Sequence, residues 1–278
     1  MSRRAKRIRT NIILYTVLIA VSVFMLLPFI WMLSTSFKLA EDIFAYPPQF
    51  IPQNPVPDNY SYVITQRDAL RSLFNTAFIA SGFTLLTLFF TTLGGYGFAK
   101  YKFPGKRSLF AFLLATMIVP GAVMMVPSFI IIRNLGWVDT PWSLIIPGAA
   151  SAFGIFFFRQ FISTIPDELL DAARIDGASE FGIYWRIVLP VISPAVLSMG
   201  LIFFMTSWNA YQGPRIYLTS PENFVLTQSI MSMQGSAGFT AWGEYMALSV
   251  ISLIPLLIIF LVFQRRIVEG IMAGSVKG

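Results

Sequence analysis

Hydrophobic residues run through this chain in long stretches that contain no charged residue. Six stretches of at least 19 residues lie at 10–37, 72–99, 108–132, 140–158, 187–214 and 245–264. A helix needs about 20 residues to cross roughly 30 Å of hydrocarbon, and a Lys or Arg at its centre costs about 2.5–3.5 kcal/mol. Because backbone groups in lipid must be satisfied within the segment, the pattern predicts an all-α, polytopic membrane protein with six transmembrane helices.

These stretches also predict how the chain is organised. We expect an N-terminus at 1–11, an uncleaved first span at 12–33, which is longer than a signal-peptide core, and a loop at 34–71 that is too rich in proline for a helix. A core at 72–265 follows, with spans at 72–99, 108–132, 140–160, 190–213 and 245–264 and a connection at 161–189, and residues 266–278 form a tail. The uncharged segment 223–243 is rich in Ser, Thr, Gln, Asn and Gly, so we interpret it as a loop with a short helix around Leu226–Met233.

The basic residues predict the orientation of the spans. With six spans, the N-terminus, the 2–3 connection, the 4–5 connection and the tail share one side, and together they hold 15 of the 20 Lys and Arg residues. The positive-inside rule therefore places both termini in the cytoplasm. The loop at 34–71 and the 215–244 connection then lie outside.

The amino-acid composition excludes several kinds of catalytic and metal-binding site. The chain is 56% hydrophobic and 12% charged, its mean hydropathy is +0.70, and it contains no His and no Cys. Histidine acid–base catalysis, cysteine nucleophiles, thiolate metal sites and disulfides are therefore excluded, and we predict no catalytic and no metal-binding residue. The net charge of +7 is explained by topology, so we expect no nucleic-acid partner.

The connection at 161–189 carries the clearest local signal. Ser163 or Thr164 is expected to cap a helix that has Pro166 in its first turn and acids at its positive end, and Gly177 is expected to end it. A second short helix is expected over 179–188. Five acids, which are unusual on this otherwise basic side, favour contact with a basic protein surface over anionic lipid: Asp167, Glu168, Asp171, Asp176 and Glu180.

The same connection resembles the EAA motif of ABC-importer permeases. Asp171-Ala172-Ala173 is followed by Gly177 and then by Ile187-Val188-Leu189-Pro190 at the family spacing, with Asp in place of the first Glu. IPDELLDAARIDGAS, Gly95-Tyr96-Gly97-Phe98-Ala99-Lys100, Trp208-Asn209 and the tail QRRIVEGIMAGSVKG are similar to the carbohydrate-type, maltose-type G permeases (MalG-like). The chain departs from them at 211–215, after Trp208-Asn209.

This resemblance implies a type I ABC importer permease with a MetI-like core. It implies four kinds of partner: a second, F-like permease, two ATPase subunits, an external solute-binding protein and a carbohydrate substrate. The chain has no phosphate-binding loop of the type G-x-x-x-x-G-K-[ST], so we expect no cofactor in it and expect ATP and Mg²⁺ in the partner ATPase. The chain is then a transport subunit and not an enzyme.

The resemblance also implies the site residues. The residues expected to couple the chain to the ATPase are Asp167, Glu168, Asp171, Ala172, Ala173, Asp176 and Gly177. The tail residues expected at the ATPase interface are Glu269, Gly270, Lys277 and Gly278, and those expected along a substrate path are Trp208, Asn209 and Tyr211. Aromatic residues stack on sugar faces, although they are also common at membrane interfaces.

Two alternatives remain open from the sequence. An ion-coupled secondary transporter usually needs an ionisable residue inside its spans, and the charge-free stretches provide none. An ABC permease for a solute other than a sugar, such as glycerol 3-phosphate, fits the same features.

Overall fold

The computed structural model describes residues 3–234 and 241–275, with backbone alone for 3–6, 8, 9 and 265–275. Every secondary-structure element within these ranges is helical, which confirms the all-α prediction. The chain divides into two compact units, which are described separately. The first unit combines residues up to Ala69 with Ile230–Ile254, and the second combines Leu70–Ser229 with the residues from Pro255 onward.

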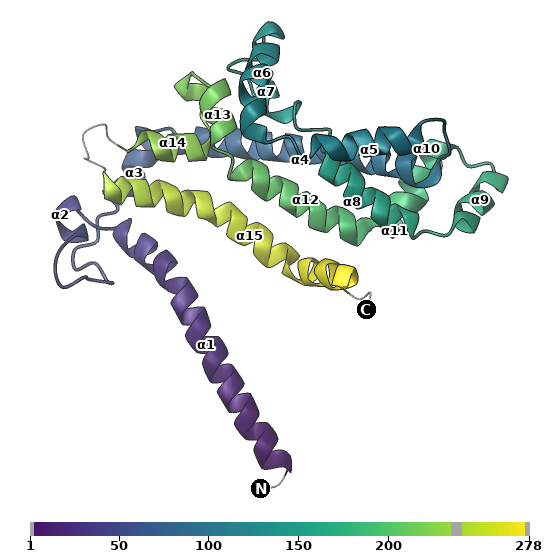
Figure 1. Ribbon diagram of the computed structural model, residues 1–278. Coiled ribbons are helices and arrows are strands. Elements are labelled where there is room, and N and C mark those ends of the chain that lie inside the picture. The colour runs from purple at the N-terminus through teal and green to yellow at the C-terminus, as the bar shows by residue number, and fades with distance from the viewer. Residues whose placement is uncertain (1–2, 235–240, 276–278) are drawn as a thin grey trace. The chain divides into compact units, whose positions relative to one another are not determined.

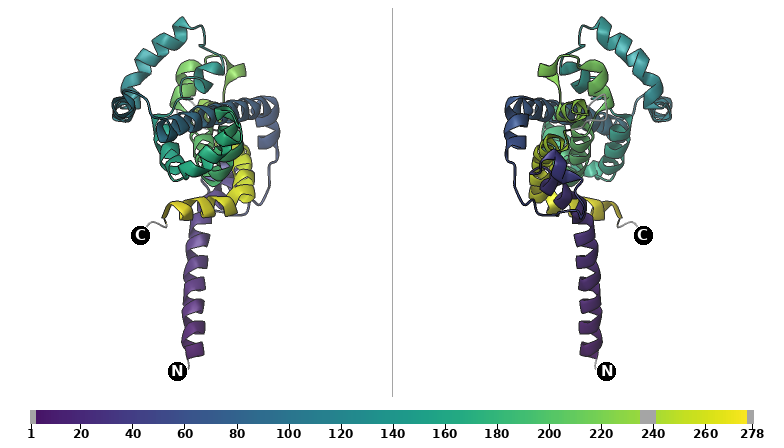
Figure 2. Two further views of the ribbon diagram at one scale, coloured as in Figure 1. Left: turned by 90° about the vertical axis from the view of Figure 1, so that its right-hand side faces the viewer. Right: turned by 90° about the vertical axis from the view of Figure 1, so that its left-hand side faces the viewer.

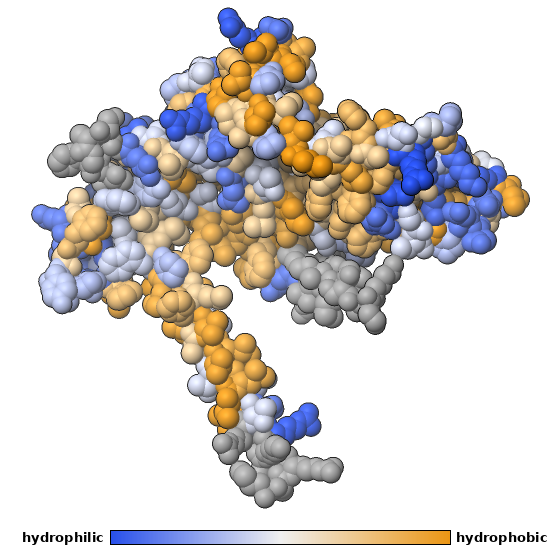
Figure 3. Space-filling model, in the orientation of Figure 1, coloured by the Kyte–Doolittle hydropathy of each residue, from blue (hydrophilic) through white to orange (hydrophobic). Residues whose placement is uncertain are grey.

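The first unit is built on the long helix α1 (Arg3–Thr35), of which Thr10–Thr35 is apolar and long enough to cross a membrane. Its surface is hydrophobic along most of its length (Figure 3), as lipid contact requires. The segment after α1 contains α2 (Ala40–Ile43) and α3 (Asp58–Thr65). The prediction that 34–71 is too rich in proline for a helix was therefore wrong, because α3 begins directly after the last proline, Pro57.

The second unit contains most of the helices (Figure 1). They are α4 (Ala69–Lys100), α5 (Lys106–Thr116), α6 (Gly121–Asn134), α7 (Trp142–Ile145), α8 (Ala152–Ser163), α9 (Asp167–Ile175), α10 (Glu180–Ile183), a π-helical turn (Tyr184–Val188), α11 (Leu189–Val191), α12 (Ser193–Trp208), α13 (Gln212–Tyr217), a 3₁₀ turn (Pro221–Asn223) and α14 (Leu226–Ser232). Helix α14 ends in the first unit, and helix α15 (Trp242–Ser275) begins in the first unit and ends in the second. The expected short helix around 226–233 is confirmed as α14.

Among the described residues, three helices are long and apolar enough to span a membrane alone: Thr10–Thr35, Ala69–Lys100 and Trp242–Gln264. The expected span at 108–132 is instead a pair, α5 and α6, bent by 100°, and Figure 2 shows α6 turning sharply away from α5. Pro120 lies at this break, as the N-cap of α6. A proline cannot continue the helix that precedes it, so the chain turns there.

The other two expected spans are also interrupted. Residues 180–191 and 193–208 form a second pair, bent by 82°. The region 140–160 contains the four-residue α7 and then the 12-residue α8, which is about 18 Å long. These bent or short elements replace the straight helices that the hydrophobic pattern predicted.

Helices α4 and α8 pack closely because glycine faces the contact. A Cβ atom at Gly95 would lie 2.8 Å from Cβ of Phe158 and 2.9 Å from the backbone nitrogen of Arg159. Small residues at such contacts let helix backbones approach in a membrane. Tyr184 adds a polar link across the unit, since its hydroxyl lies 2.7 Å from Oγ1 of Thr92 on α4.

Asp139 ties together two connections of the second unit. The Asp139 carboxylate accepts hydrogen bonds from the backbone N–H groups of Thr219 (2.9 Å) and Ser220 (3.0 Å), and Asn223 donates to its carbonyl oxygen. Burial raises the pKa of this carboxyl, but the hydrogen bonds from Ser220 and Thr219 outweigh burial and hold the pKa well below its usual range. The connection before α7 is thereby tied to the connection before α14.

The glycine contact predicts different outcomes for two neighbouring glycines of α4. Gly95→Ala should destabilise the protein by about 1–3 kcal/mol, because the added methyl has no room beside the α8 backbone. Gly97→Ala is the matched control, since a Cβ there meets nothing within 4 Å and alanine favours the helix. Thermal unfolding of the detergent-solubilised chain measures both, and equal melting temperatures for the two variants would contradict the close α4–α8 contact.

Candidate functional site

The candidate site is the segment that joins α8 to α12 (Figure 1). Helix α9 is the first helix of this segment. Helix α9 begins at Asp167 with Pro166 as its N-cap. The expected caps Ser163 and Thr164 were wrong, because their hydroxyls donate to carbonyl oxygens of α8 residues, Arg159 and Phe161, at 2.7 Å each. They close the end of α8 instead.

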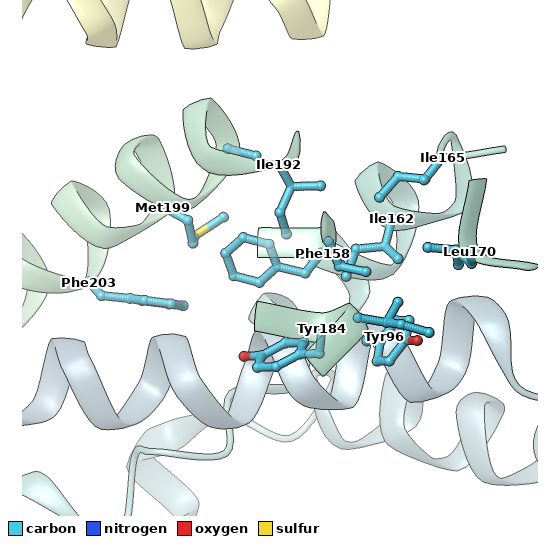
Figure 4. Close-up of a cluster of buried hydrophobic side chains, with 12 residues drawn as sticks. Tyr96, Phe158, Ile162, Ile165, Leu170, Tyr184, Ile192, Met199 and Phe203 are labelled. Carbon is cyan, nitrogen blue, oxygen red and sulfur yellow. The ribbon is translucent and has the colours of Figure 1, made fainter. Parts of the chain in front are cut away.

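Leu170 anchors α9 to the membrane helices. Its side chain is only 1% exposed and belongs to a cluster of 12 buried residues from α4, α8, α12 and the connection itself. Figure 4 shows Leu170 at one end of this cluster, near Ile162 of α8. Ala173 is partly buried and packs on the same cluster, so this side of α9 faces the protein.

A lysine at the end of α4 fixes the start of α9. Lys100 Nζ donates to Oδ1 of Asp167 at 2.7 Å and to the carbonyl oxygen of Ile165. The ammonium is buried, whereas the Asp167 side chain is exposed. The hydrogen bond and charge of Lys100 hold the pKa of Asp167 below its usual range. Asp167 therefore acts as an attachment point within this chain.

The opposite side of α9 is exposed and centres on Ala172. Residues three and four positions away on a helix share a face, and for Ala172 these are Glu168, Leu169, Ile175 and Asp176, all of which are exposed. Ile175 is 87% exposed, although it has no polar group. The face thus combines apolar and acidic side chains around a small residue, and hydrophilic residues gather over this end of the unit (Figure 3).

Gly177 ends α9 as the sequence predicted. Its φ is +81°, a conformation that costs glycine little. The Gly177 N–H donates to the Arg174 carbonyl and the Ala178 N–H donates to the Ala173 carbonyl, both at 3.0 Å, which is the Schellman pattern. Ser179 then caps α10 by accepting from the Gly182 N–H at 3.1 Å.

Glu180 joins α9 to α4. Its carboxylate accepts from Arg174 Nε at 2.8 Å and from the hydroxyls of Tyr96 (3.1 Å) and Tyr101 (2.5 Å). Arg174 also pairs with Asp171 at 2.6 Å. The hydrogen bonds from Arg174 and Tyr101 lower the pKa of Glu180 to about 2. Sequence reasoning identified Glu180 only as one of five acids, because its contacts with two tyrosines about 80 positions away leave no local signal.

The structure therefore separates the seven expected coupling residues by position. Glu168, Asp171, Ala172 and Asp176 lie on the exposed side, Asp167 is tied to Lys100, Ala173 faces the cluster and Gly177 forms the turn. Of the expected tail residues, Glu269 and Gly270 are described only as backbone within α15, and Lys277 and Gly278 lie outside the described residues.

The expected path residues lie at the other end of α12. Trp208 is only 2% exposed and stacks on Phe204, and its indole N–H has no hydrogen-bond partner among the described residues. Asn209 is exposed and donates to the Met205 carbonyl at 2.8 Å, and Tyr211 accepts from Arg215 at 3.0 Å. A cavity of about 130 Å³ near this end is lined by residues that include Thr76, Phe83, Thr206, Ser207 and Val225.

Among the described residues, three long apolar helices and two bent pairs give the chain the architecture of a membrane protein with several passes. The chain belongs to the family of binding-protein-dependent transport system inner membrane components, whose model matches residues 91–272. This family membership makes the chain a permease subunit of an ABC importer and confirms the resemblance seen in the sequence.

Relatives and solved structures agree with this family. The chain is 37% identical to the arabinooligosaccharides transport system permease protein AraQ of Bacillus subtilis, over 80% of this chain and 79% of that one. It is 32% identical to the lactose transport system permease protein LacG of Rhizobium radiobacter over the whole of both chains. A chain in the crystal structure of a bacterial ABC transporter involved in the import of the acidic polysaccharide alginate has a TM-score of 0.81, at 24% identity over 95% of this chain and 98% of that one. This likeness shows a MetI-like permease fold.

The Glu180 contacts predict a pH-dependent stability. The folded protein holds the pKa of this carboxyl at about 2, against about 4.5 in an unfolded chain, so its contribution is complete above pH 4.5 and disappears as the pH falls toward 2. Glu180→Gln should therefore lower the melting temperature at pH 7, and the difference from wild type should shrink below pH 4.5.

Asp171→Asn is the control for that experiment. Asp171 pairs with the same arginine from an exposed position three residues away, and such pairs contribute about 0.3–0.5 kcal/mol. Equal losses for the two variants at pH 7, or a Glu180→Gln loss that is as large at pH 2.5 as at pH 7, would contradict the role given to the tyrosine contacts.

Proposed function

We propose that this permease carries a carbohydrate, delivered by an external solute-binding protein, and that α9 transmits the movement of a partner ATPase to the membrane helices. The substrate class rests on the relatives, whose names specify arabinooligosaccharides and lactose. The observation that carries the coupling role is the division of α9 into a side fastened to the cluster by Leu170 and an exposed side centred on Ala172.

The proposed topology has six membrane passes with both termini in the cytoplasm. Three helices and two bent pairs supply up to five passes among the described residues, and the interrupted region containing α7 and α8 supplies the sixth. A bent or broken helix inside the membrane is tolerated where other protein groups satisfy its backbone. The excess of Lys and Arg on one side supports the cytoplasmic position of the termini.

The partners follow from the family and from the acidic side of α9. We assign a second, F-like permease beside this chain and two ATPase subunits below it, which hold the ATP and Mg²⁺. The exposed face around Ala172 is suited to a groove, since a small residue admits close approach and the neighbouring acids complement a basic rim. The tail residues Glu269, Gly270, Lys277 and Gly278 are proposed to reach the same ATPase interface.

Rigid attachment lets α9 act as a lever. When ATP closes the ATPase dimer, a docked α9 moves with its groove, and Leu170, Lys100 and Glu180 carry that displacement into α8 and α4. ATP then favours one global state of the permease because the docked surfaces bind better in that state. Transport follows as the permease alternates between inward-open and outward-open states.

The substrate path is proposed to run past the end of α12. Asn209 and Tyr211 offer polar and aromatic groups near the small cavity that Thr206 and Ser207 line, and aromatic rings stack on sugar faces. Trp208 is buried, so its proposed part is to support this end of α12 and not to stack on the sugar in the state described.

The exposed face of α9 predicts the effect of a bulky residue at its centre. Ala172→Phe should reduce ATP-driven uptake about tenfold, because a phenyl ring forced into a packed contact costs about 1–3 kcal/mol. Insertion and thermal stability should not change, since Ala172 is exposed. The same change at Ala173 is less informative, because Ala173 packs on the buried cluster.

Ala111→Phe is the matched control for Ala172→Phe. Ala111 is also an exposed alanine, on the apolar helix α5, where a phenyl ring suits a lipid environment. Uptake measured in proteoliposomes and co-purification of the ATPase report the outcome. Normal uptake and normal ATPase retention in Ala172→Phe would contradict the docking proposal.

Reconstituted uptake tests the whole assignment. Proteoliposomes that contain this chain with its partner subunits should accumulate a labelled oligosaccharide only when ATP is inside and the solute-binding protein is outside. Uptake driven by an ion gradient without ATP would contradict the ABC mechanism. Uptake of glycerol 3-phosphate with no uptake of sugars would contradict the carbohydrate assignment and leave the coupling role of α9 intact.

A further inference from the structure

A cavity lined by three cations lies where α5 begins, and its lining includes no residue of α9 and none of the expected path residues. Its volume is about 540 Å³, and the residues around it include Phe103, Lys106, Arg107, Phe110 and Arg159. It contains no acidic residue in its lining. A concentration of positive charge without a matching acid favours an anionic ligand.

The cations of this cavity are not neutralised within the described part of the chain. Among the described residues, the only cations that form ion pairs are Lys100 and Arg174, and neither lines the cavity. Lys106 Nζ donates to the Tyr101 carbonyl at 2.8 Å, which directs the ammonium without cancelling its charge.

Arg159 is held in place from two sides. Its guanidinium carbon lies 4.1 Å from the centre of the Phe110 ring, and its Nε donates to the Phe98 carbonyl at 3.4 Å. Stacking on an aromatic ring orients a guanidinium. The terminal nitrogens of Arg159 have no hydrogen-bond partner among the described residues, so they remain available as donors.

The helix itself adds to the positive character of the cavity. Helix α5 has 11 residues, its N-cap is Gly105, and no side chain caps its first turn. The first N–H groups of a helix carry partial positive charge. This contribution reinforces the three cations, which carry the argument.

An apolar surface continues from the cavity along the same helix. Leu109 is 53% exposed and Phe112 is 68% exposed, and residues three apart lie on one side of a helix. Figure 3 shows hydrophobic surface on α5 beside the hydrophilic surface near α10. A free phosphate makes no use of these side chains, whereas acyl chains pack on them.

We propose that this cavity binds the headgroup phosphate of an anionic phospholipid, whose acyl chains lie along Leu109 and Phe112. Basic pockets between membrane helices select such headgroups. Arg107 and Arg159 donate to the phosphate oxygens, and Lys106 adds a third positive charge. The site is independent of the docking role given to α9, so either assignment stands if the other fails.

Native mass spectrometry of the full chain in an uncharged detergent tests this site. Dioleoylphosphatidylglycerol is the probe, and dioleoylphosphatidylcholine and inorganic phosphate are the comparison ligands. We expect phosphatidylglycerol to bind more tightly than phosphatidylcholine, and Arg107→Gln and Arg159→Gln each to weaken phosphatidylglycerol binding about fivefold. Arg159→Lys should retain part of the affinity because it keeps the charge.

Lys102→Gln is the matched control. It removes one positive charge from the connection directly before α5, but Lys102 does not line the cavity. The affinity of this variant for phosphatidylglycerol should therefore stay within about twofold of wild type. A loss equal to that of Arg107→Gln would show general charge attraction and overturn the site.

The remaining outcomes are also decisive. Wild-type binding in both arginine variants, or equal binding of the two lipids, would overturn the proposal. Displacement of phosphatidylglycerol by millimolar phosphate would also overturn it, because the ligand of the cavity would then be a free anion and not a lipid. Melting temperatures check that each variant is folded. If Arg159→Gln does not fold because it loses its contact with Phe110, Arg107→Gln carries the test, since Arg107 is exposed at the start of the helix.

Discussion

A buried hydrophobic cluster that includes a residue of the connecting helix determines how this permease is assembled. Leu170 of α9 lies in the same cluster as Phe158 of α8 and Met199 of α12. Burial of a leucine side chain stabilises by about 1.5–3 kcal/mol, so α9 cannot swing free of the membrane helices without losing that energy. Without this anchor the connection would be a surface loop, and with it the connection is a rigid extension of the membrane-spanning region.

Polar contacts determine the orientation of α9 on this hydrophobic anchor. Lys100 holds its first residue, and Glu180 binds Arg174 near its last turn together with two tyrosines. These contacts use one side of the helix and leave the Ala172 side exposed. The acids of the loop consequently have two roles: Asp167 and Glu180 attach the helix, whereas Glu168 and Asp176 remain available to a partner. The basic cavity at the start of α5 lies outside this arrangement, and its cations pair with no acid among the described residues.

Several features of the fold and the site were predictable because they depend on short segments. The capping chemistry of Gly177, the helix α14 and the helical class all follow from local residue preferences and hydrophobic pattern. The bends in the expected spans were not predictable from the absence of charge, because that absence indicates compatibility with lipid and says little about the direction of a helix. Pro120 and the turn at Ile192 changed the direction of two expected helices.

The sequence by itself determined that this protein is a helical membrane protein with a connection of the ABC-permease type, because apolar runs and motif spacing are properties of neighbouring residues. Only the tertiary structure decided which side of α9 is exposed. That choice depends on Leu170 entering a cluster and on Lys100 and Tyr96 reaching acids that are about 70–80 positions away. Residues so distant in sequence meet only after α4 and α8 have packed, and glycine at position 95 permits that close approach.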